Sequence, residues 1–158
     1  MKNQQAKDEF IKLWGALGSQ WGINRSMAQI HALLLVSHKH LSTEDIMEQL
    51  VLSRGNANMN IRELINWNLI YKEIIPGERK EYFRAEHDVW TIATRIISER
   101  KKRELLPAQS LIKRIANETL QENDEESKHI KKTFGQLDDL LGRIDQLSAL
   151  MIRAEQNT

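Results

Sequence analysis

The sequence contains no cysteine, only two prolines and only 6% aromatic residues. Without cysteine the chain can form neither disulfides nor thiolate metal sites, which is compatible with a reducing cytosol. No apolar run approaches the roughly 18 residues that a membrane span requires, and no signal peptide is visible. We therefore expect a cytoplasmic protein that has no membrane partner.

An excess of charge of one sign is also lacking, since 23 basic and 22 acidic side chains leave a net charge of +1. Any DNA binding must then depend on a local basic patch rather than on the field of the whole chain. Charged residues make up 28% and apolar residues 41% of the 158 residues, which indicates a folded chain. This length is sufficient for one domain with its own core and an appendage.

The most informative stretch runs from Leu41 to Ala85. We expect a short helix over 43–50, with Ser42 as its N-cap and Asp45 completing a capping box. A second helix is expected over 53–67, capped by its first residue. Two short helices joined by a tight turn form a helix-turn-helix.

The second of these helices has one apolar face and one face rich in Asn and Arg. Asn is a poor helix former, so something other than helix stability is expected to maintain it there. Asn and Arg pair bidentately with adenine and guanine edges in the major groove, and backbone N–H groups at a helix N-terminus can hold a phosphate. A polar face that is merely solvated is the alternative. The candidate DNA-binding residues of this helix are Ser53, Arg54, Gly55, Asn56, Asn58 and Asn60.

A hairpin is expected after this helix, because Asn68 can adopt the left-handed conformation that ends a helix. Two β-prone runs, 69–75 and 81–85, flank a turn that carries Arg79 and Lys80. These two cations would reach phosphates or an adjacent minor groove. The expected fold class is mainly α with a small β-hairpin wing, that is, a winged helix-turn-helix followed by a long helical region.

Amphipathic helices are expected to precede this stretch. One extends to residue 17, where Gly15 and Gly18 loosen its end, and the next covers about 26–37 as the first helix of the winged helix. The predicted domains are an N-terminal helix and link over 1–22, a winged helix over 23–87 and a helical dimerisation region over 88–158.

In the last region, Asp88 is expected to cap a long helix that Pro107 breaks or kinks. An acidic hinge is expected at 122–127, and a final helix over 127–154. This helix has an apolar stripe that is too extensive to leave in water, although packing within its own chain is an alternative. The residues chosen to represent the dimerisation surface are Leu137, Leu141, Ile144 and Met151.

Four segments resemble the GbsR-type subgroup of the MarR family of winged-helix regulators, namely 21–34, 52–64, 76–83 and 99–105. The run Ser-Arg-Gly-Asn-Ala-Asn-Met-Asn is the most specific part, and Asn68 departs from the Gly that is usual in the family. The resemblance implies a homodimer that regulates compatible-solute genes. A two-fold dimer would bind a pseudo-palindromic DNA operator, and repression is the default for a binder with no visible activation surface. The resemblance also implies glycine betaine, choline or a similar osmolyte as a candidate effector.

Aromatic faces bind quaternary ammonium groups by cation–π attraction, which makes Trp14, Trp21 and Trp90 candidate ligand-binding residues. Their alternative role is in the core or an interface. No nucleophile–base pair or phosphate loop indicates an enzyme, no cofactor is implied, and His38 and His40 lack a third metal ligand nearby. A winged helix that binds proteins rather than DNA remains the alternative function.

Overall fold

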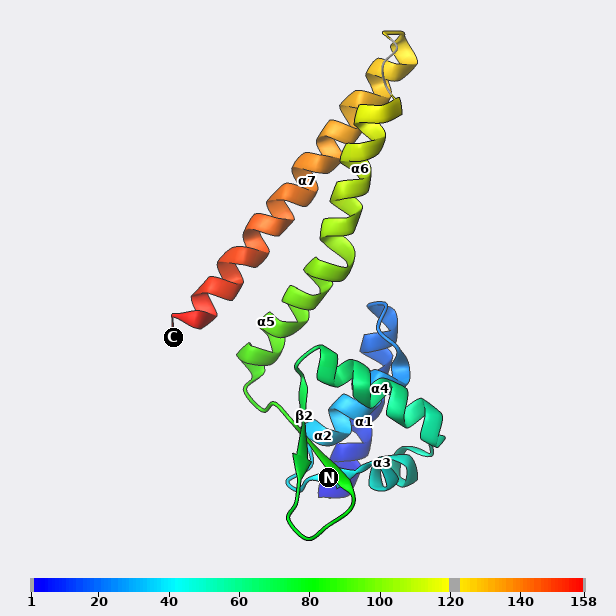
Figure 1. Ribbon diagram of the computed structural model, residues 1–158, viewed down its shortest axis with the longest axis vertical. Helices are drawn as coiled ribbons and strands as arrows, with labels where there is room; N and C mark the ends of the chain where they lie inside the picture. Colours follow the sequence, from blue (N-terminus) through cyan, green and yellow to red (C-terminus); the bar gives the residue numbers. More distant parts are fainter. Residues whose placement is uncertain (1, 120–122, 158) are drawn as a thin grey trace. The chain divides into compact units, whose positions relative to one another are not determined.

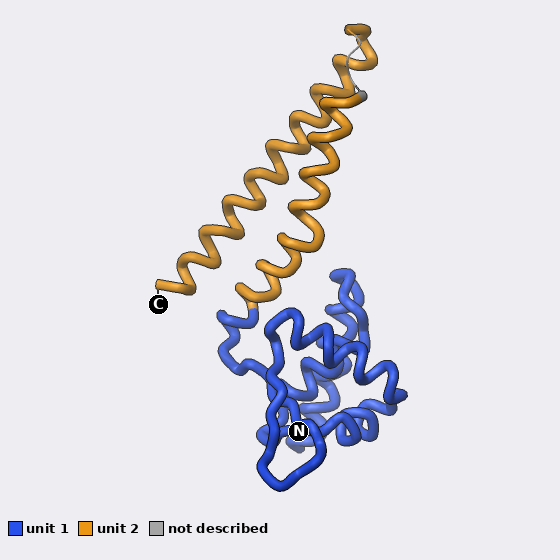
Figure 2. Tube along the Cα trace, in the orientation of Figure 1, with its two compact units in different colours: residues 1–92 blue, residues 93–158 orange. Residues whose placement is uncertain are grey.

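The computed structural model describes residues 2–119 and 123–157, and the chain divides into two compact units, 1–92 and 93–158 (Figure 2). The helix expected at the N-terminus belongs to the first unit, where it packs against the next helix (Figure 1). The elements of the first unit are α1 (Asn3–Gln20), α2 (Arg25–Leu35), β1 (Leu41–Ser42), α3 (Thr43–Leu50), α4 (Arg54–Asn66), β2 (Ile70–Ile74) and β3 (Glu81–Ala85). The long helical path that follows starts at α5 (Val89–Arg100).

Helix α2 lies at the centre of the first unit, since it contacts α1, α3, α4 and β3. Its side chains Ile30 and Leu34 are almost completely buried, as are Ile46 of α3, Leu64 of α4 and Ile70 of β2. Burying each such side chain contributes roughly 1.5–3 kcal/mol. This core holds α3 and α4 in a helix-turn-helix, which confirms the predicted arrangement.

Local caps determine where these two helices begin. Ser42 Oγ accepts a hydrogen bond from the backbone N–H of Asp45 at 3.2 Å, and Asp45 Oδ2 accepts one from the N–H of Ser42 at 2.8 Å. Ser53 Oγ accepts from the N–H of Asn56 at 3.2 Å. The predicted capping box and the predicted N-cap are therefore both confirmed.

The turn between α3 and α4 contains a strained residue. Val51 has a left-handed backbone with φ of 53°, although its side chain is branched at Cβ and 90% exposed. Glycine usually occupies such a position because Cβ crowds the carbonyl oxygen there. Asn68 ends the next helix with φ of 58°, as predicted.

Strands β2 and β3 form the predicted hairpin, with Ile70 opposite Ala85 and Ile74 opposite Glu81. Strand β1 adds to the other side of β3, giving the order β1-β3-β2. This third strand was not predicted, because two residues are too few for a period-two pattern. It pairs Ser42 with Tyr82 and thereby attaches the wing to the start of α3.

The prediction that Gly15 and Gly18 loosen the end of α1 is wrong. The helix continues through both residues to Gln20, and both are buried. A Cβ at Gly18 would lie 2.6 Å from the Cβ of Ala28, and one at Gly15 would lie 2.7 Å from Cγ of Gln29. The missing side chains allow α1 and α2 to approach closely.

The second unit contains the rest of α5, a π-helical turn η1 (Lys101–Leu105), α6 (Leu106–Thr119) and α7 (Glu125–Gln156). Asp88 caps α5 as predicted, since its Oδ1 accepts from the N–H of Thr91 at 2.7 Å. Helix α7 lies beside α6 and η1 (Figure 1). No helix among the described residues is long and apolar enough to cross a membrane.

Of the break or kink expected at Pro107, a break does not occur, because the helical path continues directly from η1 into α6. Proline lacks an N–H and its ring crowds the preceding turn, and a wider π-helical turn accommodates such a disturbance. Part of the predicted acidic hinge, residue 122, lies outside the described residues. Helix α7 begins at Glu125, two residues before the predicted start, with Asp124 Oδ1 accepting from the N–H of Ser127 at 2.8 Å.

Candidate nucleic-acid interface

The outer face of α4 is the candidate base-reading surface. Ala57, Ile61 and Leu64 are buried on its inner face and so determine which side chains point outward. Arg54 and Asn58 are exposed and stand four residues apart on one face. Ser53 and Gly55 are exposed at the start of the helix, as expected. The open space around Gly55, with no atom within 4 Å of a Cβ built there, leaves the backbone accessible.

The prediction that Asn60 lies on the exposed face is wrong. Asn60 is 2% exposed. Its Nδ2 donates to two oxygens of Asn56, the backbone O at 2.9 Å and the side-chain Oδ1 at 2.6 Å. Residue 60 follows the buried Ala57 by three positions and so belongs to the apolar stripe. Asn56 is half-buried, and its Nδ2 donates to Ser26 Oγ of α2 at 3.5 Å. Asn56 and Asn60 therefore bond within the first unit, and Asn58 is the exposed one of the three candidate asparagines.

An acidic residue that the sequence analysis did not identify stands beside Arg54. Arg54 Nη1 donates to Glu44 Oε1 of α3 at 3.1 Å. The pKa of Glu44 is lowered, mainly by a hydrogen bond from its own backbone N–H, next by that from Arg54, and further by the charges of Arg54 and Lys80. An acid in the first turn of α3 was a visible signal, but its partner ten residues later depends on how the two helices cross.

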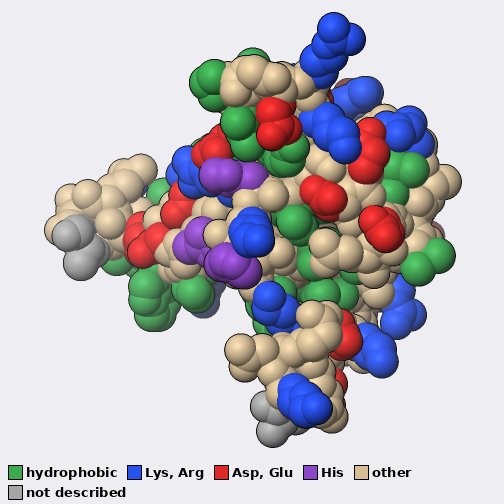
Figure 3. All heavy atoms as spheres, turned by 90° about the horizontal axis from the view of Figure 1, so that it is seen from below, with side chains coloured by type: hydrophobic (Ala, Val, Ile, Leu, Met, Phe, Trp, Pro, Cys, Tyr) green, Lys and Arg blue, Asp and Glu red, His purple; other side chains and the backbone are tan. Residues whose placement is uncertain are grey.

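The wing presents a basic tip on a body whose charges are mostly paired. Lys72 Nζ lies 2.6 Å from Glu81 Oε1, and Arg84 pairs with Glu73. Arg79 and Lys80 at the tip are exposed, and in the described part of the chain neither forms an ion pair. Figure 3 shows how Lys and Arg side chains lie among Asp and Glu side chains on one face. The two tip cations are therefore the local basic site that DNA binding by a chain of near-zero net charge would need.

The three candidate ligand-binding tryptophans all belong to the first unit. Trp14 of α1 is half-buried, with its ring centroid 5.6 Å from that of Phe10 and 6.2 Å from that of His31. Its Nε1–H donates to His31 Nδ1 at 3.3 Å. Trp21 is 61% and Trp90 70% exposed. Trp14 is thus part of an α1–α2 contact, and the other two rings are accessible to solvent.

His31, which accepts the hydrogen bond from Trp14, has a strongly lowered pKa. It is 3% exposed, and burial lowers its pKa from 6.5 to about 4. Because Nδ1 accepts from Trp14, the proton of the neutral ring is assigned to Nε2. That atom is buried and has no hydrogen-bond partner among the described residues.

The described residues contain no group of three His, Asp or Glu side chains that could hold a metal ion. His40 Nε2 instead lies 2.7 Å from Glu73 Oε2 on the wing. Its neighbour His38 is exposed.

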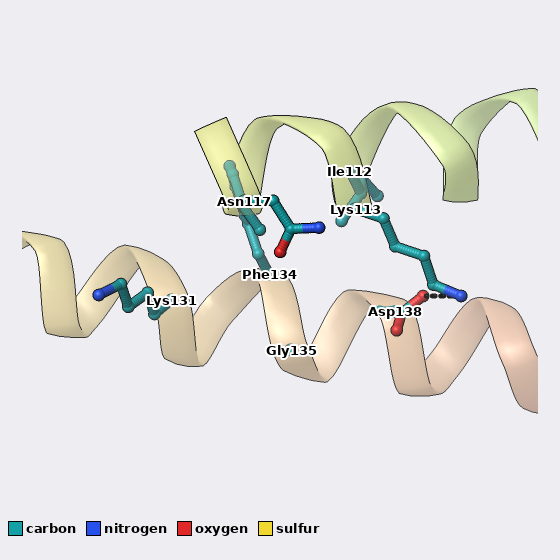
Figure 4. Close-up of a pocket in the computed structure, with 8 residues that line it drawn as sticks. Ile112, Lys113, Asn117, Lys131, Phe134, Gly135 and Asp138 are labelled. Atoms are coloured by element: carbon teal, nitrogen blue, oxygen red, sulfur yellow. Dashed lines mark ion pairs between the residues drawn. The ribbon is translucent and has the colours of Figure 1, made fainter. Parts of the chain in front are cut away.

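Two hollows lie between the helices of the second unit. The first, of about 450 Å³, lies between α6 and α7 (Figure 4). Lys113 Nζ and Asp138 Oδ1 lie 3.7 Å apart at its edge, and Phe134 and Ile112 form apolar parts of its lining. The second, of about 420 Å³, is mostly apolar and includes Ile144. Neither brings together a set of groups suited to catalysis.

The predicted dimerisation stripe on α7 is exposed in the single chain. Leu137, Ile144 and Met151 are exposed, and Leu141 is half-buried. Further exposed apolar side chains on the same helix are Leu140, Leu147 and Leu150. An apolar surface that continues over several turns favours burial against a partner.

The fold is that of a winged helix with two long C-terminal helical segments. A crystal structure described as that of a transcriptional regulator has a TM-score of 0.73 and 19% identity, covering 97% of this chain and 99% of that chain. A structure of a mutant of S. aureus MepR bound to an oligodeoxyribonucleotide has a TM-score of 0.44 and 16% identity, covering 87% and 94%. A score below 0.5 does not establish a common fold. No protein-family model matches the chain, and no curated protein matches its sequence.

Proposed function

We propose that this chain is a dimeric, sequence-specific DNA-binding transcriptional regulator that acts as a repressor. The observation that supports this most is the outer face of α4, which presents Arg54, Gly55 and Asn58 from a helix anchored in the core. Arg pairs with guanine and Asn with adenine in the major groove, whose width admits a helix. A winged helix with such a face has the side chains and the geometry for direct base readout.

The wing supports the same proposal through a separate contact. Arg79 and Lys80 are exposed at the tip of a hairpin that β1 connects to the start of α3. Cations at such a tip contact phosphates or enter the adjacent minor groove. They supply affinity for any duplex, whereas α4 supplies the discrimination between sequences.

Dimerisation completes the proposal, because one recognition helix reads too few base pairs for an operator. A two-fold dimer formed through the apolar stripe of α7 would present two α4 helices to successive major grooves. The expected operator is therefore pseudo-palindromic.

The test is selection of duplexes from a random library, followed by fluorescence anisotropy of the selected duplex and of a random duplex. The proposal expects a two-fold symmetric consensus that binds far more tightly than random DNA. Absence of any consensus from a folded protein would overturn the proposal and would favour a winged helix that binds proteins.

Asn58→Ala is expected to reduce affinity for the selected duplex by about 1–3 kcal/mol, because a bidentate contact to a base edge is lost. Affinity for random DNA should not change, since Asn58 is neutral. The matched control is Asn66→Ala, which removes an exposed asparagine at the other end of α4. Equal losses on both duplexes would contradict a base-reading role for Asn58.

We further propose that a quaternary-ammonium or zwitterionic osmolyte such as glycine betaine, choline or ectoine controls binding at compatible-solute genes. The resemblance to GbsR-type regulators motivates this proposal. The accessible faces of Trp21 and Trp90 can provide cation–π contacts, and the half-buried Trp14 is the third candidate. To act as an effector, the solute must bind one dimer geometry better than another.

Trp90→Ala is expected to leave DNA binding intact and to abolish the response to the osmolyte. Anisotropy titrations with millimolar glycine betaine, choline or ectoine measure this response, and sucrose at the same osmolality is the control. A response that survives unchanged in the variant would exclude Trp90 from the ligand site. A response equal to that with sucrose would contradict an osmolyte site altogether.

A further inference from the structure

Glu44 lies in the first turn of α3, between the first residue of the recognition helix and the wing. Its Oε1 accepts from Arg54 Nη1 at 3.1 Å, and the charge of Lys80 acts on it as well. Ser42, two residues earlier, pairs with Tyr82 of β3 and holds this end of α3 against the wing. The carboxylate thus lies within the surface that would approach DNA.

Stability does not explain this ion pair. Both side chains are about half exposed, and exposed ion pairs contribute little to folding because water and salt screen them. An exposed carboxylate close to phosphates also opposes DNA binding by like-charge repulsion. The carboxylate therefore weakens general affinity for DNA, and its pairing with Arg54 adds little to the stability of the free protein.

We propose that Glu44 is a specificity-determining residue, which keeps Arg54 from phosphates and releases it to a guanine edge in the major groove. This inference rests on the proposed function. On random DNA, Arg54 would exchange its carboxylate partner for a single phosphate contact while Glu44 remained near the backbone charges. On the operator, the O6 and N7 atoms of guanine would replace the carboxylate with two hydrogen bonds in fixed geometry.

Glu44 therefore acts as a positioning residue through Arg54, and discrimination arises from a penalty on the wrong duplex as well as from a contact to the right one. Lys80 contributes by attracting the same carboxylate, so that the wing and α4 share one counter-charge.

The principal variant is Glu44→Gln, compared with Glu48→Gln on the same helix. Both variants make the same change in net charge. Glu48 is the control because it is exposed and forms no ion pair within the described ranges. Glu44→Gln is expected to raise affinity for random DNA about threefold or more and to steepen its salt dependence by about one unit, because Arg54 becomes free to neutralise a phosphate. The ratio of operator to random affinity should fall.

Two further measurements test whether Glu44 acts through Arg54 and whether Arg54 contacts guanine. In an Arg54→Ala background, Glu44→Gln is expected to lose most of its effect on discrimination, since its partner is absent. Replacing guanines of the selected duplex by 7-deazaguanine, which lacks N7, should weaken wild-type binding but not that of Arg54→Ala.

Equal behaviour of Glu44→Gln and Glu48→Gln, with normal discrimination by the wild type, would overturn this inference alone. An undiminished effect in the Arg54→Ala background would show that Glu44 acts by repulsion only and would overturn its role through Arg54. A consensus without guanine would overturn the guanine contact. Failure of the wild type to prefer any duplex would overturn the proposed function, and this inference with it.

Discussion

At about pH 5 the free energy of unfolding of this protein is expected to be about 2 kcal/mol lower than at about pH 7, because of His31. Burial lowers the pKa of this residue from 6.5 to about 4 in the folded protein. Below pH 6.5 the unfolded chain binds a proton that the folded chain does not accept. The contribution of His31 to stability is therefore nearly constant above pH 7 and falls as the pH decreases from 6.5 towards 4, by about 3 kcal/mol in total.

The physical cause is the surroundings of the ring between α1 and α2. Nδ1 accepts from Trp14, so a second proton on the ring would face an N–H and place a charge in an apolar contact. Urea unfolding at several pH values and one protein concentration measures the effect. His31→Gln is the matched variant, since its other histidines are those of the wild type. Equal pH profiles for the two proteins would contradict the prediction.

Ile144→Asp is expected to convert a dimer into a monomer. Ile144 belongs to the exposed stripe of α7, and burying a carboxylate in an apolar interface without a partner costs several kcal/mol. Operator affinity should fall by about a hundredfold or more, because each half-site would then be bound independently. Sedimentation velocity measures the mass, and anisotropy on the selected duplex measures the affinity.

Ile144 also lines a hollow within the second unit, so this variant could alter the packing of the helices themselves. Leu147→Asp is therefore the second variant, since Leu147 is 63% exposed on the same helix. Gln146→Asp adds the same charge away from the stripe and should remain dimeric. A wild-type monomer, or a dimer that tolerates both stripe variants, would contradict the assigned dimer surface.

Much of the fold could be predicted because its signals are local. Ser42 with Asp45, Ser53 and Asn68 act through hydrogen bonds or backbone angles within a few residues, and each was found at its predicted position. The hairpin followed from the turn sequence after Ile75 for the same reason. Caps and turns depend on short-range geometry, which the order of residues specifies directly.

The candidate site was predicted less completely, since it depends on which side of a helix faces the core. Asn60 was assigned to the outer face of α4, yet α4 is rotated so that this residue is buried. The polar pattern alone does not distinguish an asparagine that bonds back to Asn56 from one that remains accessible. Packing against α2 decides between them.

The order of the helices and of the two hairpin strands, the positions of the caps and the residue types that are candidates for contacting DNA all follow from local patterns in the sequence. Three features depend instead on tertiary packing: Asn58 is accessible while Asn60 is not, Gly18 allows a close helix contact, and Glu44 pairs with Arg54. Hydrogen bonds over three or four residues follow from the sequence. Contacts between helices follow from how buried side chains fill the space between them, and this involves residues far apart in the chain.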